Sequence, residues 1–93
     1  QMCIETGVTQ DLDCKVSTDT DKATISVTNT GNLVAKYVQY TALFFQGDEL
    51  VYADNDYVVD SDNEIKAGQT EKAESSCNKK FDSVKVYLNG SAY

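Results

Sequence analysis

The sequence predicts an all-β domain, an antiparallel β-sandwich of about seven short strands. Apolar and polar residues alternate with a period of two in several short segments, which is typical of half-buried strands. Polar turns rich in Asn, Asp and Gly separate these segments. No segment shows the competing apolar spacing of an amphipathic helix. We expect one domain over residues 1–93, with its folded core in residues 11–90.

The N-terminal half begins with a predicted β-hairpin. One strand is expected at residues 14–18 and the next at residues 23–29, with a polar turn at residues 19–22 between them. In the second strand, Ile25 and Val27 alternate with hydroxyl side chains, so one face would be buried. A polar turn and a loop then lead to the most apolar segment of the chain.

That segment covers residues 37–45, and both of its faces are largely apolar. We therefore expect it to be a central strand. Short strands should follow at residues 50–53 and 57–59, because acidic residues at 54–56 interrupt the pattern.

Two further strands complete the predicted sandwich. Residues 70–76 carry little apolar content, which predicts an edge strand, and residues 84–88 alternate cleanly. The period-two positions predict a shared core formed by Ile25, Val27, Val38, Tyr40, Phe44, Val84, Val86 and Leu88.

Four segments together resemble the FxLYD domain family: 27–31 (VTNTG), 37–45 (YVQYTALFF), 52–58 (YADNDYV) and 65–69 (IKAGQ). That family consists of small immunoglobulin-like sandwiches in secreted and surface proteins of bacteria and archaea. In place of the family's Pro-Gly-Glu, this chain has Ala67, Gly68 and Gln69. The resemblance implies an immunoglobulin-like fold and an extracytoplasmic scaffold or interaction module, and it brings no catalytic or ligand residues with it.

Charge and composition exclude several classes of partner. The net charge is -7, from eight basic and fifteen acidic residues. Nucleic acids and anionic membrane surfaces both require a basic face, so we expect neither as a partner. No apolar run approaches the roughly 20 residues that a membrane-spanning helix needs. We expect a monomer, with an unknown protein or a cell-surface component as its partner.

The three cysteines, Cys3, Cys14 and Cys77, point to an oxidising compartment. The spacing is too wide for a zinc site, and the chain has no histidine. Cys14 shares a strand face with Leu12 and Val16, and Cys77 shares one with Ala73 and Ser75 in residues 71–77, so both cysteines are expected to point toward the core. We therefore favour a Cys14–Cys77 disulfide; pairings through Cys3, or buried reduced thiols, are the alternatives.

An acidic segment offers a candidate calcium site. Asp60, Asp62, Glu64 and Glu71 have the spacing of positions one, three, five and twelve in an EF-hand loop. The sixth position requires Gly for a sharp turn, but here it is Ile65. A solvated acidic loop is therefore the favoured interpretation, and we expect no metal and no cofactor.

Aromatic residues offer a candidate contact surface. Tyr37, Phe45, Tyr52 and Tyr87, together with Tyr57, are predicted to line one sheet face. Tyrosines suit recognition because the ring supplies area and the hydroxyl supplies a hydrogen bond. The alternative is that these rings only cover the second face of a small domain.

No catalytic constellation is present in the sequence. Without histidine, a Ser-His-Asp or Cys-His arrangement cannot form, and no Gly-rich phosphate loop occurs. We therefore expect no enzyme. The sequence favours a non-catalytic structural or protein-interaction module of a bacterial secreted or cell-surface protein. The alternative is a ligand-binding module that holds a glycan, a peptide or calcium.

Overall fold

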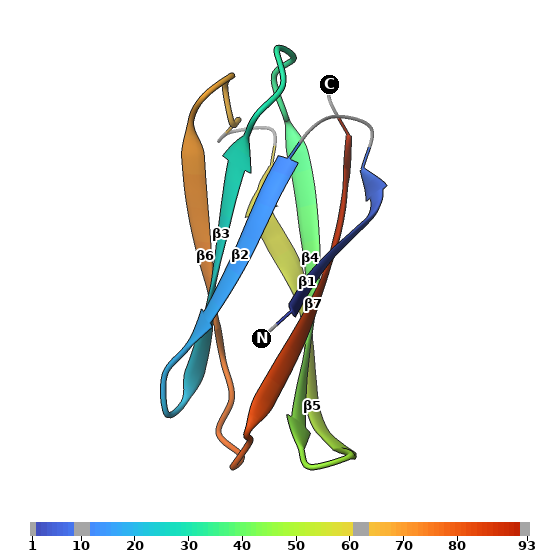
Figure 1. The fold of residues 1–93 in the computed structure, drawn as a ribbon, viewed down its shortest axis with the longest axis vertical. Helices are drawn as coiled ribbons and strands as arrows, with labels where there is room; N and C mark the ends of the chain where they lie inside the picture. Colours follow the sequence, from blue (N-terminus) through green and yellow to red (C-terminus); the bar gives the residue numbers. More distant parts are fainter. Residues whose placement is uncertain (1, 9–11, 61–63, 92–93) are drawn as a thin grey trace.

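A computed structural model of the chain describes residues 2–8, 12–60 and 64–91. The described residues form two β-sheets that face each other, with their strands along the 38 Å long axis of the molecule (Figure 1). The strands are β1 (Met2–Val8), β2 (Leu12–Thr18), β3 (Lys22–Asn29), β4 (Tyr37–Gln46), β5 (Glu49–Val59), β6 (Thr70–Ser76) and β7 (Ser83–Ser91). The predicted all-β class is confirmed.

The two sheets differ in size and in connectivity. The smaller sheet has the order β2-β3-β6, and all of its pairs are antiparallel. The larger sheet has the order β1-β7-β4-β5, in which β1 runs parallel to β7 and the other pairs are antiparallel. Thr70–Ser76 is an edge strand, as the sequence predicted. The predicted central strand, β4, lies between β7 and β5.

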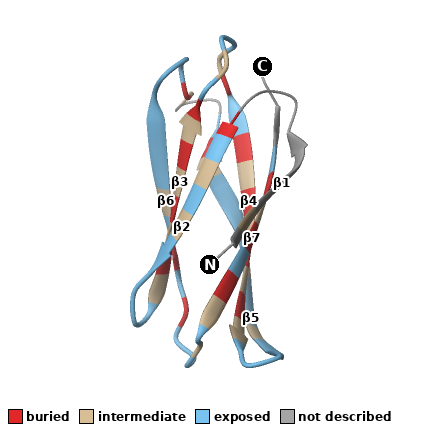
Figure 2. Ribbon diagram, in the orientation of Figure 1, coloured by how far each residue is buried: buried red, intermediate tan, exposed pale blue. Residues whose placement is uncertain are grey.

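The core lies between the sheets and is formed by period-two positions. All eight residues of the predicted core are buried. Buried residues alternate with more exposed ones along β3 and β4 (Figure 2). The Phe44 ring contacts the rings of Tyr52 and Phe81, with centroids 5.8 Å and 4.9 Å away. Ile65 and Ala35, which are not in the predicted core, pair with each other in an isolated bridge and are fully buried.

Strand β5 corrects one prediction, because acidic residues do not interrupt it. Residues 54–56 lie inside one continuous strand that pairs with β4. Asp54 is tolerated there because it accepts hydrogen bonds from neighbouring strands, including one of 2.6 Å from the Ser75 hydroxyl on β6. Strand β1 is not among the predicted strands, and the predicted core begins after it, at residue 11.

The predicted Cys14–Cys77 disulfide is wrong, because the structure bonds Cys14 to Cys3. The Cα atoms of that pair are 5.9 Å apart, within the normal range for a disulfide. Cys14 lies opposite Val27, whereas the amide of Cys77 donates to the carbonyl of Asp21 in the β2–β3 turn. Val27, opposite Cys14, and Lys22, beside the turn that Cys77 contacts, are about 16 Å apart along β3. Cys77 is therefore out of reach of Cys14. Cys77 is a buried free thiol.

One buried side chain organises the upper end of the sandwich in Figure 1. The Asn29 amide nitrogen donates to the carbonyls of Leu33 and Ile65, at 2.6 Å and 2.9 Å. Its side-chain oxygen accepts from the backbone amide of Gly31 at 3.0 Å. The residue is fully buried, so these bonds satisfy polar groups that water does not reach. Asn29 therefore fixes the loop after β3 against the segment that precedes β6.

Candidate interaction surface

The outward side of the larger sheet carries most of the exposed aromatic side chains. Because side chains alternate along a strand, the odd-numbered residues of β4 point away from the core, together with their register partners on β5 and β7. We call this surface the aromatic face. Its apolar and aromatic members among the described side chains are Tyr37, Leu43, Phe45, Leu50, Ala53, Tyr57 and Tyr87.

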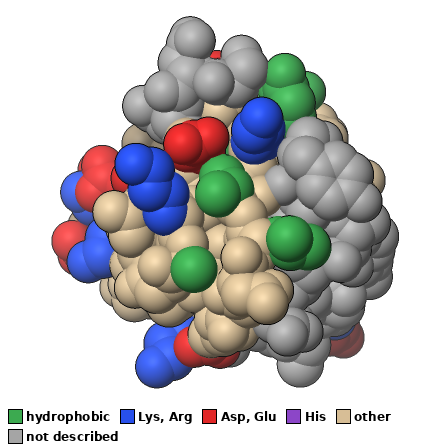
Figure 3. Space-filling model, turned by 90° about the horizontal axis from the view of Figure 1, so that it is seen from above, with side chains coloured by type: hydrophobic (Ala, Val, Ile, Leu, Met, Phe, Trp, Pro, Cys, Tyr) green, Lys and Arg blue, Asp and Glu red, His purple; other side chains and the backbone are tan. Residues whose placement is uncertain are grey.

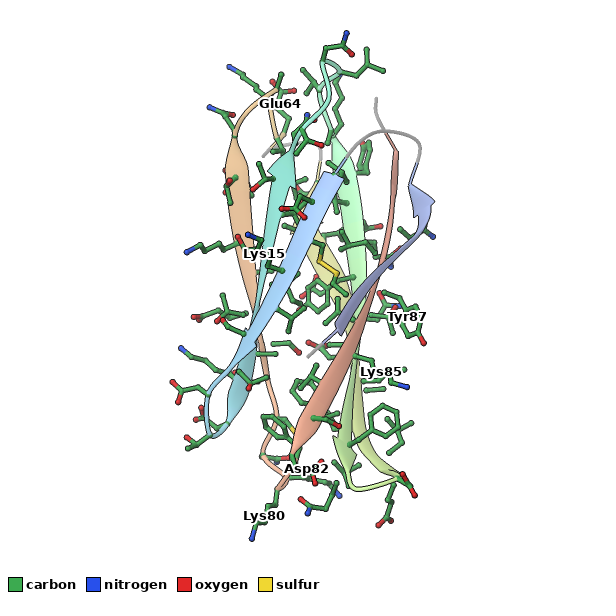
Figure 4. All side chains as sticks on the ribbon, viewed as in Figure 1. Lys15, Glu64, Lys80, Asp82, Lys85 and Tyr87 are labelled. Carbon is green, nitrogen blue, oxygen red and sulfur yellow. A yellow bond between two sulfur atoms is a disulfide. The ribbon has the colours of Figure 1, made fainter. Side chains whose placement is uncertain are left out.

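Several of these side chains are open to solvent. Tyr37 is 42% exposed, Leu50 is 50% exposed and Tyr57 is 48% exposed. Figure 4 labels Tyr87 and Lys85, which project from β7 on the side away from the smaller sheet. The Lys85 ammonium lies 5.6 Å from the centre of the Phe45 ring, a cation–π distance. A Tyr or Phe exposed in this way supplies large contact area at low entropic cost.

The polar members of the aromatic face are almost all uncharged. They are Gln39, Thr41, Asn55, Ser83, Lys85 and Asn89. Gln39 and Asn55 form an exposed side-chain hydrogen bond of 2.7 Å beside Tyr57. Among the described side chains of this face, none is a carboxylate, although the whole chain contains fifteen acidic residues.

The outward side of the smaller sheet has the opposite character. We call it the polar face. Its members are Asp13, Lys15, Ser17, Lys22, Thr24, Ser26, Thr28, Thr70, Lys72, Glu74 and Ser76. Lys22 and Glu74 form an exposed salt bridge of 3.0 Å on it. In the view from above, acidic and basic side chains gather along the left rim, the side of β6 (Figure 3). Such a mixed charged surface is typical of a side that stays in water.

The structure brings together three of the four residues predicted to form the contact face. Tyr37 and Phe45 on β4 and Tyr87 on β7 lie on the aromatic face. Tyr52 does not join them, because it pairs with Phe44 and its ring packs against the Phe44 ring on the core side.

Leu50, which the sequence pattern does not single out, also lies on the aromatic face, and Tyr57 lies there together with Tyr37, Phe45 and Tyr87. A register irregularity between Phe44 and Phe45 pairs Phe45 with Leu50. Tyr57 was part of the aromatic set in the sequence, but its face depended on β5 being one continuous strand.

A polar cluster links β5 of the larger sheet to β6 of the smaller sheet, on the side of the sandwich opposite the Cys3–Cys14 disulfide. One carboxylate oxygen of Asp54 accepts from the Tyr40 hydroxyl at 3.1 Å and from the Ser75 hydroxyl at 2.6 Å. Burial, and then the nearby charge of Asp54, raises the pKa of Tyr40 to about 12. Ser75 is 1% exposed, so its hydroxyl is closed to a substrate. The cluster is therefore a contact between sheets and does not provide a reactive group.

The described residues of the candidate calcium loop are not grouped as a metal site. Asp62 lies outside the residues that the structure describes. Asp60 follows the end of β5, Glu64 precedes the Ile65 bridge, and Glu71 is on β6. Within residues 2–8, 12–60 and 64–91, no three His, Cys, Asp or Glu side chains are grouped closely enough to hold a metal ion.

In the described part of the chain, no helix has the length and apolar character needed to cross a membrane.

Comparisons with known proteins found no relative of this chain. No protein-family model, no curated protein and no solved structure matches the chain.

Proposed function

We propose that this domain is a non-catalytic protein-interaction module that meets its partner through the aromatic face. The contrast between the two outward surfaces of the sandwich is the observation that carries this proposal. One surface presents tyrosines, leucines and Phe45 without a described carboxylate, and the other presents only charged and hydroxyl side chains. Protein interfaces are enriched in aromatic residues and depleted in Asp, Glu and Lys relative to other surfaces. The aromatic face has that composition.

We also propose that the parent protein is secreted or attached to the surface of a bacterial cell. The Cys3–Cys14 disulfide supports this location, because disulfides persist in oxidising compartments. The bacterial source rests on the resemblance to the FxLYD family alone, and kinship with that family remains part of the proposal.

An immunoglobulin-like arrangement of the strands is part of the same proposal. The order β2-β3-β6 corresponds to strands A, B and E of that fold, and β5-β4-β7 corresponds to C′, C and F. The last immunoglobulin strand, G, follows F in sequence, whereas here β1 occupies the place beside β7 and runs parallel to it. This correspondence supports an immunoglobulin-like sandwich whose edge beside F is supplied from the opposite end of the sequence.

A binding comparison of surface variants tests the proposed contact. The wild-type domain, a Tyr37→Ser/Tyr57→Ser double variant and a Leu33→Ser variant would be immobilised and exposed to a cell-envelope extract of the source organism. Leu33 is the matched control, because it is 49% exposed and lies in the loop between β3 and β4. We expect the double variant to lose the partner that the wild type and Leu33→Ser retain. Equal retention by all three proteins would contradict the proposal.

A neutral glycan or peptide is the second candidate for the same surface. The hydrogen-bonded amides of Gln39 and Asn55 lie beside the exposed Tyr57 ring. A ring with adjacent amides suits a sugar, which presents an apolar face and a rim of hydroxyl groups. A glycan array probed with the wild type and with Tyr57→Ser distinguishes this candidate from a protein partner. We expect no specific calcium binding, and a calcium-dependent rise in melting temperature that magnesium does not reproduce would contradict that expectation.

A further inference from the structure

We infer that the aromatic face binds the aromatic face of a second copy of this chain, and that the two copies form a weak two-fold dimer. The inference rests on the surface named in the proposed function and specifies its partner. A two-fold contact places the same patch of both copies together, so the patch must complement itself.

The distribution of charge selects this face for self-association. The chain carries a net charge of -7, so two copies repel each other at long range. A contact through the polar face would bring Asp13 and Glu74 of each copy into the interface. The described side chains of the aromatic face contain no carboxylate, and its Lys85 ammonium already lies over the Phe45 ring. Two copies can therefore meet there without opposing carboxylates among the described side chains of β7, β4 and β5.

The size of the face predicts a weak and reversible dimer. Strands β7, β4 and β5 are spaced about 4.8 Å apart and run for about 30 Å, which gives a flat area of roughly 400–450 Å² per copy. A dimer through these three strands would bury on the order of 800–900 Å² in total. Interfaces of this size are at the low end of specific association.

The salt dependence of such a dimer is distinctive. Contact through a face whose described side chains include no carboxylate has no attraction between opposite charges for salt to screen, whereas the long-range repulsion between two copies is screened. Raising the NaCl concentration from about 0.1 M to about 1 M shortens the screening length from about 10 Å to about 3 Å. We expect the dissociation constant of the dimer to fall several-fold over this range. A dimer held by complementary charges would weaken instead.

Sedimentation equilibrium of the purified chain tests the inference, at concentrations up to about 1 mM and at both salt concentrations. Ala53 is exposed and pairs with Leu43 on the aromatic face, so a charge can be added there without opening the core. We expect both Ala53→Glu and Ala53→Lys to weaken the dimer at least about tenfold, because either charged side chain would have to leave water when the two faces meet. Ser26→Glu and Ser26→Lys, on the polar face, are controls for the change in net charge and should retain the dimer.

The possible results separate this inference from the proposed function. A chain that remains monomeric at both salt concentrations overturns the inference, as does a dimer that both Ala53 variants leave intact. Neither result affects binding of another protein to the aromatic face, which the Tyr37→Ser/Tyr57→Ser comparison tests by itself. Dimerisation that strengthens with salt and is lost only in the Ala53 variants supports the inference.

Discussion

At the scale of single residues, Asn29 holds two loops together, a role that the residues around it in the sequence do not reveal. Its side chain donates to two carbonyl groups and accepts from one amide while it is fully buried. Loss of the side chain would leave the Leu33 and Ile65 carbonyls without these donors, and a buried polar group without a partner is costly. The Asn-Thr-Gly sequence at residues 29–31 reads as a turn, but it also holds two loops together.

We expect Asn29→Ala to lower the free energy of unfolding by about 2–4 kcal/mol. Asn29→Asp should cost at least as much, because a carboxylate there would face the two carbonyl oxygens that the amide now satisfies. Urea unfolding of both variants measures the effect, with the exposed Asn32→Ala as the control in the same loop. A loss below about 1 kcal/mol for Asn29→Ala, the size of a surface change, would show that Asn29 is not structural.

Tyr40 gives the fold a predicted response to high pH. The phenol pKa is raised to about 12 in the folded protein, mainly by burial and then by the charge of Asp54, against about 10 in an unfolded chain. The folded state therefore holds this proton more tightly than the unfolded state. The resulting stabilisation is fully present below pH of about 10, and it is lost as the pH rises through about 12.

A Tyr40→Phe variant isolates this effect. Between pH of about 9 and about 11.5, we expect the wild type to lose more unfolding free energy than Tyr40→Phe does. Tyrosinate absorbance of the native proteins gives a second measurement, in which the wild type should show one tyrosine that ionises late and the variant should not. Identical pH profiles for the two proteins would place the Tyr40 hydroxyl in an ordinary aqueous environment.

At the scale of elements, the two open sides of the sandwich are closed by different chemistry. In the larger sheet, Cys3, Val86, Ala42 and Asp54 lie in one row across the four strands. Cys3 is bonded to Cys14 on β2, and Asp54 accepts a hydrogen bond from Ser75 on β6. Both ends of the row are therefore attached to the opposite sheet, one covalently and one by a hydrogen bond.

The Cys3–Cys14 disulfide, which joins β1 to β2, predicts how the three cysteines react. In the unreduced native protein, Cys3 and Cys14 should appear in one cross-linked peptide, and Cys77 should react with an alkylating reagent only after unfolding because it is buried. A Cys3→Ser/Cys14→Ser variant should lose about 2–3 kcal/mol, since the bond closes a short loop of sequence separation 11. Peptide mapping and urea unfolding measure the two effects. A peptide joining Cys77 to either of the other cysteines would contradict this pairing.

The elements that were predictable from the sequence are those whose pattern is local. Alternation within β3, β4 and β7 identified the buried side of each strand, because side-chain direction depends only on position along a strand. The disulfide and the continuity of β5 depended on register between distant strands. Asp54 breaks the apolar pattern in sequence, and the Tyr40 and Ser75 hydroxyls that make it tolerable are 14 and 21 residues away. Local patterning cannot supply that information.

The candidate surface was predictable to the same extent and for the same reason. Tyr37 and Phe45 share a face of β4 by alternation alone, and Tyr87 joins them once β7 pairs with β4. Tyr52 and Tyr57 were harder to place, because register irregularities between β4 and β5 determine which side each one takes. The absence of carboxylates among the described side chains of the aromatic face depends on the register of three strands, so local alternation does not predict it.

At the scale of the whole molecule, the sandwich separates charge from aromatic surface. The acidic residues that give the chain its net charge of -7 lie on the polar face, in turns and loops, and on the inward side of β5, among other places. The aromatic face is left with Lys85 as its charged member among the described side chains. One side of a strongly acidic domain is thereby left with a single charged group among its described side chains.

Site-directed photocrosslinking tests the contact face most directly. A photoreactive phenylalanine analogue would replace Tyr57 on the aromatic face in one protein and Lys72 on the polar face in another, and both positions are exposed. Each protein would be irradiated at high concentration and with a cell-envelope extract of the source organism. We predict crosslinks from position 57, to a second copy or to another protein, and none from position 72. Crosslinks from position 72 with none from position 57 would contradict the account.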